Sequence, residues 1–446
     1  MTLLILLFSL YVKFLAFAII VACLLRVPVK AYHICWIAAG AAALLLHDLY
    51  IIAVTQLALD YHTFWSVGRD LWEGLDPYDP LRFAAAPFLH PPTALPVFAL
   101  FATVPYQWGL AIWTVLNILL GLALPILAYR TLCSQAASSN PRSGAVPTFR
   151  ELPPPVLAAL TLALIVSDAF RYGLFAGQLG VVTAVALLAA LDSQGRGHPV
   201  VAGLWLGLAT MKISTTLPFL LLFLRKRDVG TGIALTLTVS ALCLLGGSPE
   251  LLPGRVSLTL QRIQALGSPG QVNDYSFQGT QYATIIGFDH ALYRLGLRDR
   301  IIIRNLQWVV VVLLGTGIAS QVVANRLPRP ALCSLVALYS VLFFYHRIYD
   351  TVILVLPLAH SVSRARSADG LARWLFSASC LAMILVLFAS ASFLKPLTEA
   401  SLNWGLWGRL VQATATAYPT WMVLAAMVCI YSGESWNHRR IGVQSK

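Results

Sequence analysis

The chain has 446 residues, of which 58% are hydrophobic and only 11% are charged. A soluble domain normally carries about 25% charged residues, so this composition excludes a water-soluble protein of this size. The net charge of +13 would favour nucleic-acid binding in a soluble protein, but here the basic residues lie mostly in short segments between apolar runs. Such residues set membrane orientation and contact anionic lipid, so we expect no nucleic-acid partner.

Apolar runs long enough to cross a hydrocarbon core of about 30 Å recur from one end of the chain to the other. We therefore expect an all-α polytopic membrane protein with about thirteen crossing helices, within a range of about ten to fourteen because boundaries shift by a few residues. One stretch leaves two alternatives, since 200–224 fits either one crossing or a hairpin of two half-length helices that turns near Lys212. The predicted spans are 4–25, 33–56, 92–105, 107–130, 154–170, 178–192, 200–224, 228–247, 306–324, 331–345, 349–363, 374–394 and 416–432.

Basic residues predict the orientation of these spans. Under this threading the basic segments fall on one side of the membrane, which the positive-inside tendency makes cytoplasmic. The other side receives 57–91, 248–305 and 395–415, which are longer and richer in Gly, Pro and aromatic residues, so we expect the chemistry to face outward. The basic segments are Arg26 with Lys30, Arg225-Lys226-Arg227, Arg326 with Arg329, Arg364 with Arg366, and Arg439-Arg440.

The first outward segment favours a short amphipathic helix that lies at the membrane interface. Phe64, Val67 and Leu71 recur at i, i+3 and i+7 and form an apolar stripe, and charged residues such as Asp70 are predicted to lie opposite it. Trp65 is of the type that anchors such helices at headgroup level.

Asp60 lies where a membrane helix ends and this interfacial helix begins. A carboxylate there touches water and can also approach a lipid-borne substrate, which suits a general base that takes a proton from an attacking sugar hydroxyl. The alternative is that Asp60 caps the N-terminus of the following helix, because Asp is favoured at that position.

These motifs together resemble glycosyltransferase family 87. The resemblance rests on Asp60, the aromatic-rich helix after it, Gly74-Leu-Asp-Pro-Tyr78, and His90-Pro-Pro-Thr-Ala-Leu95 before the next span. It implies a GT-C fold like that of actinobacterial mannosyltransferases and related arabinofuranosyltransferases, with Asp60 as catalytic base. It also places Tyr61, His62 and His90 near the substrate. We expect one transmembrane domain over 1–446.

Two elements further along the chain extend the resemblance. Gly177-Gln178 is similar to the family's Gly-Gln element, and Gln178 is a candidate substrate ligand. Gly203 and Gly207 are four residues apart, which allows another helix to approach closely. Lys212 follows inside an apolar run, where an unpaired charge costs at least about 2.5–3.5 kcal/mol. The resemblance implies that Lys212 contacts the donor's phosphate, and the alternative is a lysine that reaches to the interface.

The second outward segment carries Asn273-Asp274-Tyr275-Ser276, which resembles the family's Asn-Gln-Ser element but departs from it at Asp274 and Tyr275. Asn273 and Ser276 are candidates to bind sugar hydroxyls. An ordinary loop explains the same residues equally well.

A last polar cluster is Phe344-Tyr345-His346-Arg347-Ile348-Tyr349-Asp350, which lies between two predicted spans. If this segment is helical, His346 and Asp350 share a face and the carboxylate orients the imidazole. Arg347 and His346 are candidate ligands of the donor phosphate, because a guanidinium suits phosphate, and Tyr349 and Asp350 are candidate substrate ligands. The alternative is an interfacial belt with an arginine that reaches the headgroups.

With the resemblance, we expect an inverting transfer of mannose or another hexose or pentose from a polyprenyl-phosphate donor to a lipid or glycan acceptor. No nucleotide-binding glycine-rich loop is evident, and we expect no cofactor and no metal. The resemblance implies a multi-pass protein of the bacterial inner membrane with an extracytoplasmic site that serves the cell envelope. The alternatives are a membrane transporter and a lipid-linked polysaccharide polymerase or ligase.

Overall fold

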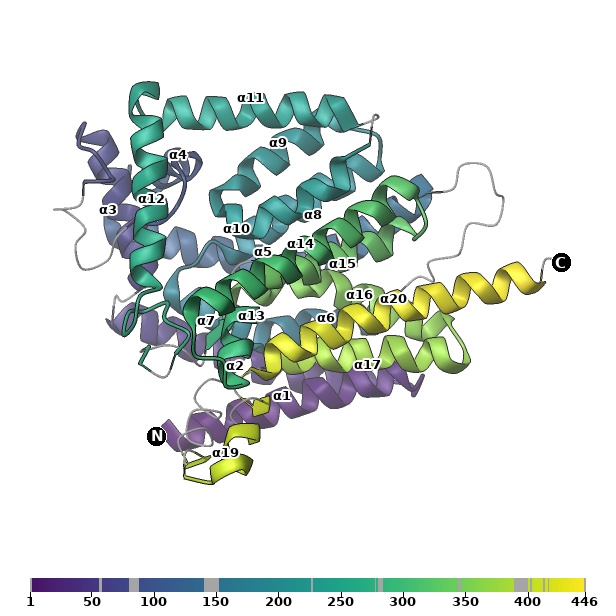
Figure 1. The fold of residues 1–446 in the computed structure, drawn as a ribbon. Coiled ribbons are helices and arrows are strands. Elements are labelled where there is room, and N and C mark those ends of the chain that lie inside the picture. The colour runs from purple at the N-terminus through teal and green to yellow at the C-terminus, as the bar shows by residue number, and fades with distance from the viewer. Residues whose placement is uncertain are drawn as a thin grey trace.

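The protein is an all-α polytopic membrane protein in which helices account for nearly all of the described chain. The computed structural model describes residues 2–55, 58–79, 88–139, 152–225, 228–276, 278–279, 284–343, 346–388, 400–401, 403–411, 414–415 and 417–444. Within these residues the only sheet is a two-stranded antiparallel pair, β1 (Ile285–Ile286) with β2 (His346–Arg347). Its helices run along one another in a bundle (Figure 1).

Six helical segments of the described chain are long and apolar enough to cross a membrane. They are α1 (Thr2–Leu24), α2 (Ala31–Thr55), α5 (Tyr106–Ser139), the segment Pro199–Phe223, α14 (Arg300–Ala324) and α17 (Gly370–Leu387). Two bent pairs, α6 (Pro154–Val166) with α7 (Asp168–Ala176) and α11 (Val229–Leu245) with Pro249–Leu266, raise the number to eight if each pair is one span.

Other predicted spans form shorter elements. Three shorter apolar helical segments, Pro92–Phe101, α8 (Gly180–Gly195) and α15 (Arg329–Phe343), correspond to predicted spans 92–105, 178–192 and 331–345. The remaining helices are η1 (Pro92–Ala94), α3 (Leu59–Trp72), α4 (Leu95–Phe101), η5 (Pro249–Leu251), α12 (Leu252–Leu266), α13 (Phe288–Arg294), η7 (Ile348–Leu354), α16 (Val355–Ser367), α19 (Gly405–Val411) and α20 (Tyr418–Gln444).

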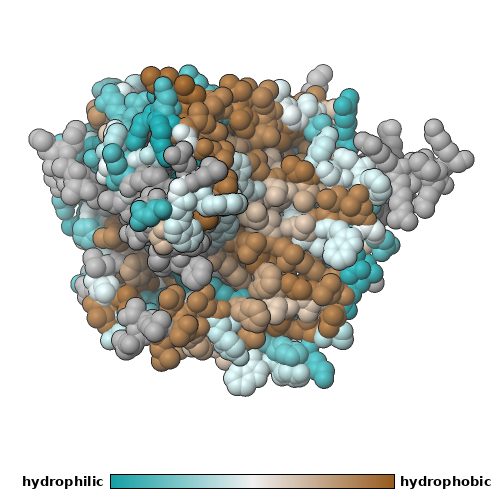
Figure 2. Space-filling model, turned by 60° about the horizontal axis from the view of Figure 1, so that its bottom comes forward, coloured by the Kyte–Doolittle hydropathy of each residue, from teal (hydrophilic) through white to brown (hydrophobic). Residues whose placement is uncertain are grey.

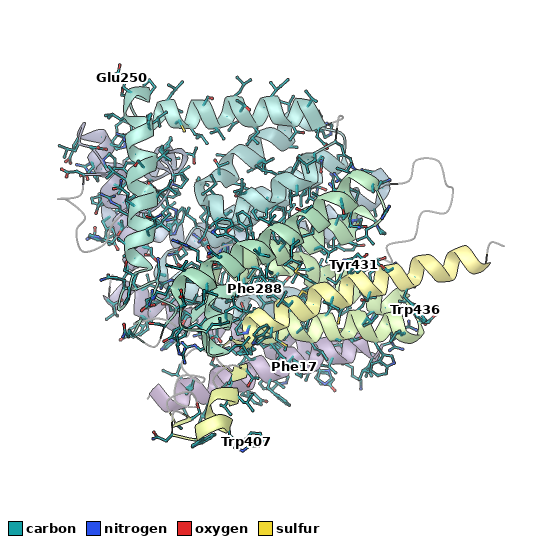
Figure 3. The ribbon with its side chains drawn as sticks, in the orientation of Figure 1. Phe17, Glu250, Phe288, Trp407, Tyr431 and Trp436 are labelled. Atoms are coloured by element: carbon teal, nitrogen blue, oxygen red, sulfur yellow. The ribbon has the colours of Figure 1, made fainter. Side chains whose placement is uncertain are left out.

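The surface of the bundle is apolar, as lipid contact requires. The face in Figure 2 carries broad hydrophobic areas, with hydrophilic side chains toward its margins. Aromatic residues are exposed on the last helices, where Trp407 on α19 is 73% exposed and Tyr431 and Trp436 on α20 are about half exposed (Figure 3). Amphipathic rings of this kind favour the membrane–water interface.

The segment around Lys212 meets the length and hydropathy of one span, as the first of the two predicted alternatives has it. It is irregular, because α9 (Pro199–Ala209) gives way to η2 (Thr210–Lys212), α10 (Ile213–Thr216) and η3 (Leu217–Phe223). Lys212 leaves the helical region of backbone space, with φ −128° and ψ 79°. The backbone break therefore falls at the one charged residue of the span.

Helices α9 and α11 pack closely through the two predicted glycines. A Cβ added to Gly203 would lie 2.5 Å from the Thr231 carbonyl oxygen, and one added to Gly207 would lie 2.5 Å from Cγ2 of Thr238. Larger side chains would push the helices apart, which confirms the predicted role of this spacing.

The chain turns sharply after α11 and crosses one end of the bundle. Pro249–Leu266 makes an angle of 100° with α11, and Figure 1 shows α12 standing across the end where α3 lies. Arg255 forms an ion pair of 3.1 Å with Asp76, and Arg262 Nη2 donates to the Tyr78 carbonyl oxygen at 2.7 Å. The two outward segments predicted from the sequence are thus bonded to each other.

Basic segments from distant parts of the chain meet at the opposite end. Arg26 Nη2 donates to the Arg366 carbonyl oxygen at 3.0 Å, and Arg225 Nη2 donates to Asn325 Oδ1 at 2.7 Å. In Figure 1 the C-terminal end of α1 lies at this end, away from α3 and α12. Lys226 and Arg227 of the predicted basic set lie outside the described residues.

Helix α3 follows the predicted amphipathic pattern with one exception. Phe64 and Val67 are buried, and the Phe64 ring stacks on Phe98 of α4 with centroids 4.3 Å apart. Asp70, predicted on the exposed face, is buried at 4% exposure, so that prediction is wrong. The reason is geometric, because Asp70 projects only about 60° around the helix from the buried Val67.

Candidate active site

Helix α7 ends in a tight turn that carries Gln178 to α3. Gly177 closes the helix in the left-handed region with φ 73°, and the backbone N–H of Gln178 donates to the Gly173 carbonyl oxygen at 2.9 Å. A Cβ on Gly177 would lie 2.6 Å from Cβ of Tyr61, so only glycine lets α3 come this close. The Gln178 side-chain amide then donates to the Asp60 carboxylate.

Asp60 is the second residue of α3 and does not cap it. The N-cap position belongs to Ala58, which makes no side-chain cap, so the capping alternative for Asp60 is wrong. Burial raises the pKa of Asp60 above its ordinary value, and the hydrogen bond from Gln178 and the charges of Arg347 and Lys212 oppose this rise. The carboxylate is therefore largely shielded from solvent, in a site where two cationic side chains act on it.

Lys212 is buried and forms an ion pair with Asp350. Its ammonium also lies 4.9 Å from the centroid of the Tyr349 ring, on which it makes a cation–π contact. A lysine held inside by a carboxylate and an aromatic face does not reach to the interface, so that alternative is wrong. The predicted site residues Lys212, Tyr349 and Asp350 are thus neighbours.

His346 binds the other oxygen of the same carboxylate. Its Nδ1 lies 2.9 Å from Asp350 Oδ2, so the two side chains meet as expected for a shared face, but they do so without an α-helix, because His346 lies in β2 and Asp350 in η7. The antiparallel pairing of β2 with β1, in which His346 faces Ile286, extends the backbone here. The buried Nε2 of His346 has no hydrogen-bond partner within the described chain. Phe344 and Tyr345 lie outside the described residues.

Arg347 connects this cluster to the second outward segment. Its Nη2 donates to Asn273 Oδ1 at 2.8 Å and to the Val272 carbonyl oxygen at 3.1 Å. Arg347 therefore holds the loop that carries Asn273, and its charge also acts on Asp60.

The same loop is stabilised from inside by Asp274. Ser276 Oγ donates to Asp274 Oδ2 at 2.6 Å, and Arg300 forms an ion pair of 2.8 Å with Asp274. Burial alone would raise the pKa of Asp274, but hydrogen bonds from Ser276, Gly270 and Arg300 outweigh it and hold the pKa below its ordinary value. Ser276 thus has a clear partner in its own loop.

His90 lies beside the Lys212 segment. Its Nδ1 is 3.3 Å from the Met211 carbonyl oxygen, and its ring meets Phe64 edge-on with centroids 5.0 Å apart. Burial, with the Lys212 charge, lowers the pKa of His90 to about 4, so the imidazole is neutral at pH 7. A neutral histidine next to a buried lysine avoids like-charge repulsion.

Tyr61 and His62 make aromatic contacts. Tyr61 is buried and its ring lies 5.8 Å from that of Trp113, whereas His62 is exposed and its ring meets Tyr106 edge-on at 5.5 Å. Trp113 in turn donates through Nε1 to the Gly177 carbonyl oxygen at 3.1 Å. Tyr61 and Trp113 therefore support the turn that presents Gln178.

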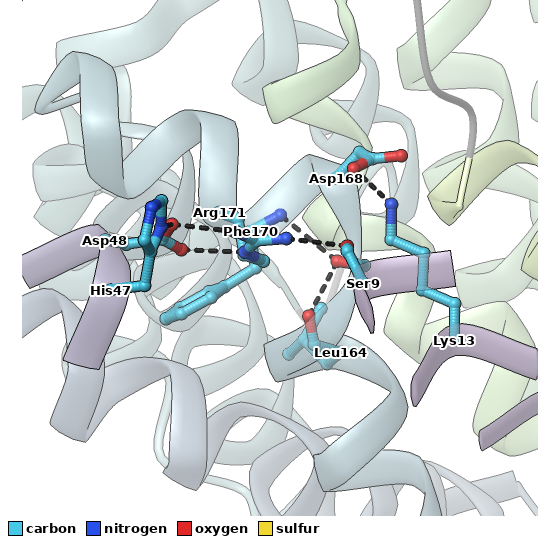
Figure 4. A network of polar contacts seen from close by, with 9 residues as sticks. Ser9, Lys13, His47, Asp48, Leu164, Asp168, Phe170 and Arg171 are labelled. Carbon is cyan, nitrogen blue, oxygen red and sulfur yellow. Dashed lines mark hydrogen bonds and ion pairs between the residues drawn. The ribbon is translucent and has the colours of Figure 1, made fainter. Parts of the chain in front are cut away.

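A buried network between α1, α2 and α7 was not predicted from the sequence. Arg171 on α7 forms an ion pair with Asp48 on α2, and Lys13 on α1 forms one with Asp168 on α7 (Figure 4). The available signal was the presence of charged residues inside or directly beside apolar runs, where such residues mark function or pairing.

Residues 88–345 match the family model of glycosyltransferase family 87, which is more than half of the chain. The chain belongs to this family. It is therefore a membrane glycosyltransferase. The matched region contains His90, Gln178, Lys212 and Asn273, whereas Asp60 precedes it. A search of curated proteins finds no match to the chain.

Proposed function

We propose that this glycosyltransferase transfers a sugar from a polyprenyl-phosphate donor to a hydroxyl of a lipid or glycan acceptor, with inversion at the anomeric carbon. In the step, a bond forms between the acceptor oxygen and the anomeric carbon, and the bond from that carbon to the phosphate oxygen breaks. The acceptor proton goes to Asp60, and polyprenyl phosphate leaves with its negative charge. The observation that carries the proposal is the pairing of Asp60 with Gln178 in the field of Lys212 and Arg347.

Asp60 acts in this proposal as the general base. Gln178 orients its carboxylate, since the amide donates to one oxygen and leaves the other for the acceptor hydroxyl. The raised pKa supports this role, because a more basic carboxylate takes a proton more readily. Tyr61, His62 and His90 lie around the acceptor, and Tyr61 also supports the turn at Gly177 that presents Gln178.

The cations act on the leaving group. Lys212, paired with Asp350, directs its ammonium toward the donor phosphate. The Nε2 of His346, which has no hydrogen-bond partner within the described chain, donates to the same phosphate when the imidazole carries both protons. Preorganised donors of this kind stabilise charge that develops in the transition state. Asp350 holds both groups in place, Tyr349 supports Lys212, and Arg347 aligns the Asn273–Ser276 loop with the sugar.

The site is proposed to face outward on a GT-C scaffold in a bacterial inner membrane. Support comes from its position at the end of the bundle opposite the basic segments, which the positive-inside tendency places in the cytoplasm. A transporter would keep its polar residues near the bilayer midplane, between repeats. The position of α3 and α12 across one end favours transfer at a membrane surface.

Replacement of Asp60 tests the proposal. Purified protein in nanodiscs is incubated with radiolabelled polyprenyl-phosphate mannose or polyprenyl-phosphate arabinose and a membrane-lipid extract as acceptor. Asp60→Asn should lower kcat by about 10²–10⁴-fold, because that is the usual contribution of a general base. Binding of the donor should persist.

The matched control is Asp299→Asn. Asp299 caps α14 and accepts from the N–H groups of Ile301 and Ile302, and asparagine caps a helix equally well. It should transfer sugar at the wild-type rate. Wild-type turnover by Asp60→Asn removes Asp60 from the mechanism, and a wild-type enzyme that transfers sugar only from nucleotide donors overturns the donor class.

A further inference from the structure

Arg171 binds two other helices at once from its position on α7. Its Nε and Nη2 donate to the two oxygens of Asp48 on α2, each at 2.7 Å, and its Nη1 donates to Ser9 Oγ on α1 at 2.9 Å (Figure 4). The two parallel bonds to Asp48 form a planar fork, which fixes direction as well as distance.

A second ion pair of the same network completes its charge balance. Lys13 Nζ lies 2.5 Å from Asp168 Oδ1, so Ser9 and Lys13, four residues apart on α1, face Arg171 and Asp168, three residues apart on α7. Two acids and two bases are thus paired inside the apolar bundle. Buried ion pairs add little net stability relative to apolar packing, but in some proteins they fix how packed elements are aligned.

The other end of α7 reaches both halves of the candidate active site. Arg171 lies six residues before Gly177, which is about 9 Å along a helix. Between them, the Tyr172 ring stacks on Tyr349 at 5.9 Å with an interplanar angle of 10°, and Tyr349 lies under Lys212. Beyond Gly177, Gln178 bonds to Asp60.

The partner of Arg171 also leads to Asp60. Asp48 lies on α2, and the chain passes from the end of α2 at Thr55 to the start of α3 at Leu59. The Asp48–Arg171 fork therefore joins the helix that precedes Asp60 to the helix that precedes Gln178. No other described ion pair links α2 with α7.

We propose that Arg171 is a positioning residue for this enzyme: its fork to Asp48 sets the position of α7 so that Gln178 meets Asp60. The inference rests on the proposed role of Asp60 as the base. Lysine at this position would keep the charge but would lose the fork, because its ammonium is a single point of contact. Loss of the fork frees α7 to rotate and withdraws Gln178 from the carboxylate.

The test compares Arg171→Lys, Gln178→Ala and the double variant in sugar transfer over a range of pH. Arg171→Lys should lower kcat about ten-fold with little change in the KM for the donor, since sub-ångström misplacement near a reacting group is costly. The acid limb of the kcat profile should move to higher pH in both single variants, because Gln178 no longer stabilises the ionised base. Arg347, Lys212 and Asp350 also face Asp60 and stay unchanged.

The shift of the acid limb in the double variant separates a positioning role of Arg171 from a general loss of stability. If Arg171 acts through Gln178, the double variant has the same acid limb as Gln178→Ala alone, with no further shift. An acid limb that stays at the wild-type position in Arg171→Lys, whatever its Tm, overturns the inference. So does a double variant whose two shifts add.

The matched control is Arg364→Lys. Arg364 makes the same kind of fork to Glu434, at 2.7 and 2.9 Å, between α16 and α20 and away from α7. This variant should lose Tm to a similar extent as Arg171→Lys but should keep the wild-type acid limb and kcat. An acid limb that moves equally in Arg364→Lys also overturns the inference.

A readout without turnover distinguishes this inference from the proposed function. The infrared carboxyl band of Asp60 is obtained by subtracting the spectrum of Asp60→Asn from that of the same protein with Asp60 intact. This band is titrated with pH in the wild type and in Arg171→Lys. Arg171→Lys should move its titration to higher pH even if no polyprenyl-phosphate sugar is a donor. Failure of transfer with this shift present rejects the proposed function alone, and an unshifted band rejects the role of Arg171.

Discussion

Two carboxylates in this molecule each hold one histidine and one basic side chain, yet their surroundings differ. Asp350 binds Lys212 and His346 in the candidate site, and Glu434 on α20 binds Arg364 and His360 on α16. Both carboxylates are buried.

The difference lies in the cation and the backbone. Arg364 uses its fork on both oxygens of Glu434 from one regular helix to another, α16 to α20. Lys212 instead approaches Asp350 from a break in a span, and His346 comes from a two-residue strand. A lysine ammonium rotates freely and forms one contact as easily as another, whereas a guanidinium fork is fixed. The first cluster can rearrange around a ligand, and the second one holds helices.

Among the changes that test this comparison of the two clusters, replacement of Lys212 should have the largest effect. Lys212→Met keeps the volume but removes the charge that we propose for the departing phosphate, so kcat should fall by about 10²–10³-fold. Turnover of labelled donor in nanodiscs measures it, and Arg225→Met, at the opposite end of the bundle, is the control. Equal loss in both variants would contradict the distinction between the two ends.

Replacement of Glu434 should mainly affect stability. Glu434→Gln leaves Arg364 without its counter-charge inside the bundle, which costs about 3–5 kcal/mol for a buried pair. The fall in Tm, measured by the loss of folded protein on heating in detergent, should be clear, while kcat per folded molecule stays near the wild-type value. A selective loss of kcat with unchanged Tm would assign this cluster to the chemistry.

The pH dependence of kcat should show the smallest effect. Below the pKa of Asp60, kcat should fall by up to about ten-fold for each pH unit. Transfer needs ionised Asp60, so kcat falls as pH falls through the pKa of this group. Because burial raises that pKa, the fall begins at a higher pH than an exposed aspartate would give. The kcat profile of the wild type measures it, with the thermal stability of the protein at each pH as control. A rate that stays flat as the pH falls through the ordinary pKa of an exposed aspartate contradicts Asp60 as the base.

The class of protein and several elements could be predicted because they depend on local pattern. Apolar runs and sparse charge indicate membrane helices, and the stripe of Phe64 and Val67 indicates α3. Gly203 and Gly207 predicted a close helix contact from spacing alone. Asp70 was misplaced because a stripe indicates the most buried side of a helix and not how much of its circumference a neighbour covers.

The candidate site could be predicted only in part, because its contacts join distant residues. Asp60 and Gln178 were each singled out, but 118 residues separate them and one sequence carries no signal of their bond. His346 and Asp350 were paired correctly by an i, i+4 spacing although the segment is not an α-helix, since a strand followed by the 3₁₀ helix η7 brings them together as well. Arg171 was missed because it lies just past an apolar run and its partner is 123 residues away.

The right-angled course of α12 has a consequence for synthesis of the protein. Arg255 and Arg262 on this helix bind Asp76 and Tyr78, which precede them by 179 and 184 residues. At about 5–20 residues per second, a ribosome needs roughly 10–40 s to add that length. The segment that follows Asp60 therefore waits in the nascent protein without these partners, and the enzyme matures only after α11 has been inserted and α12 has folded back across the bundle.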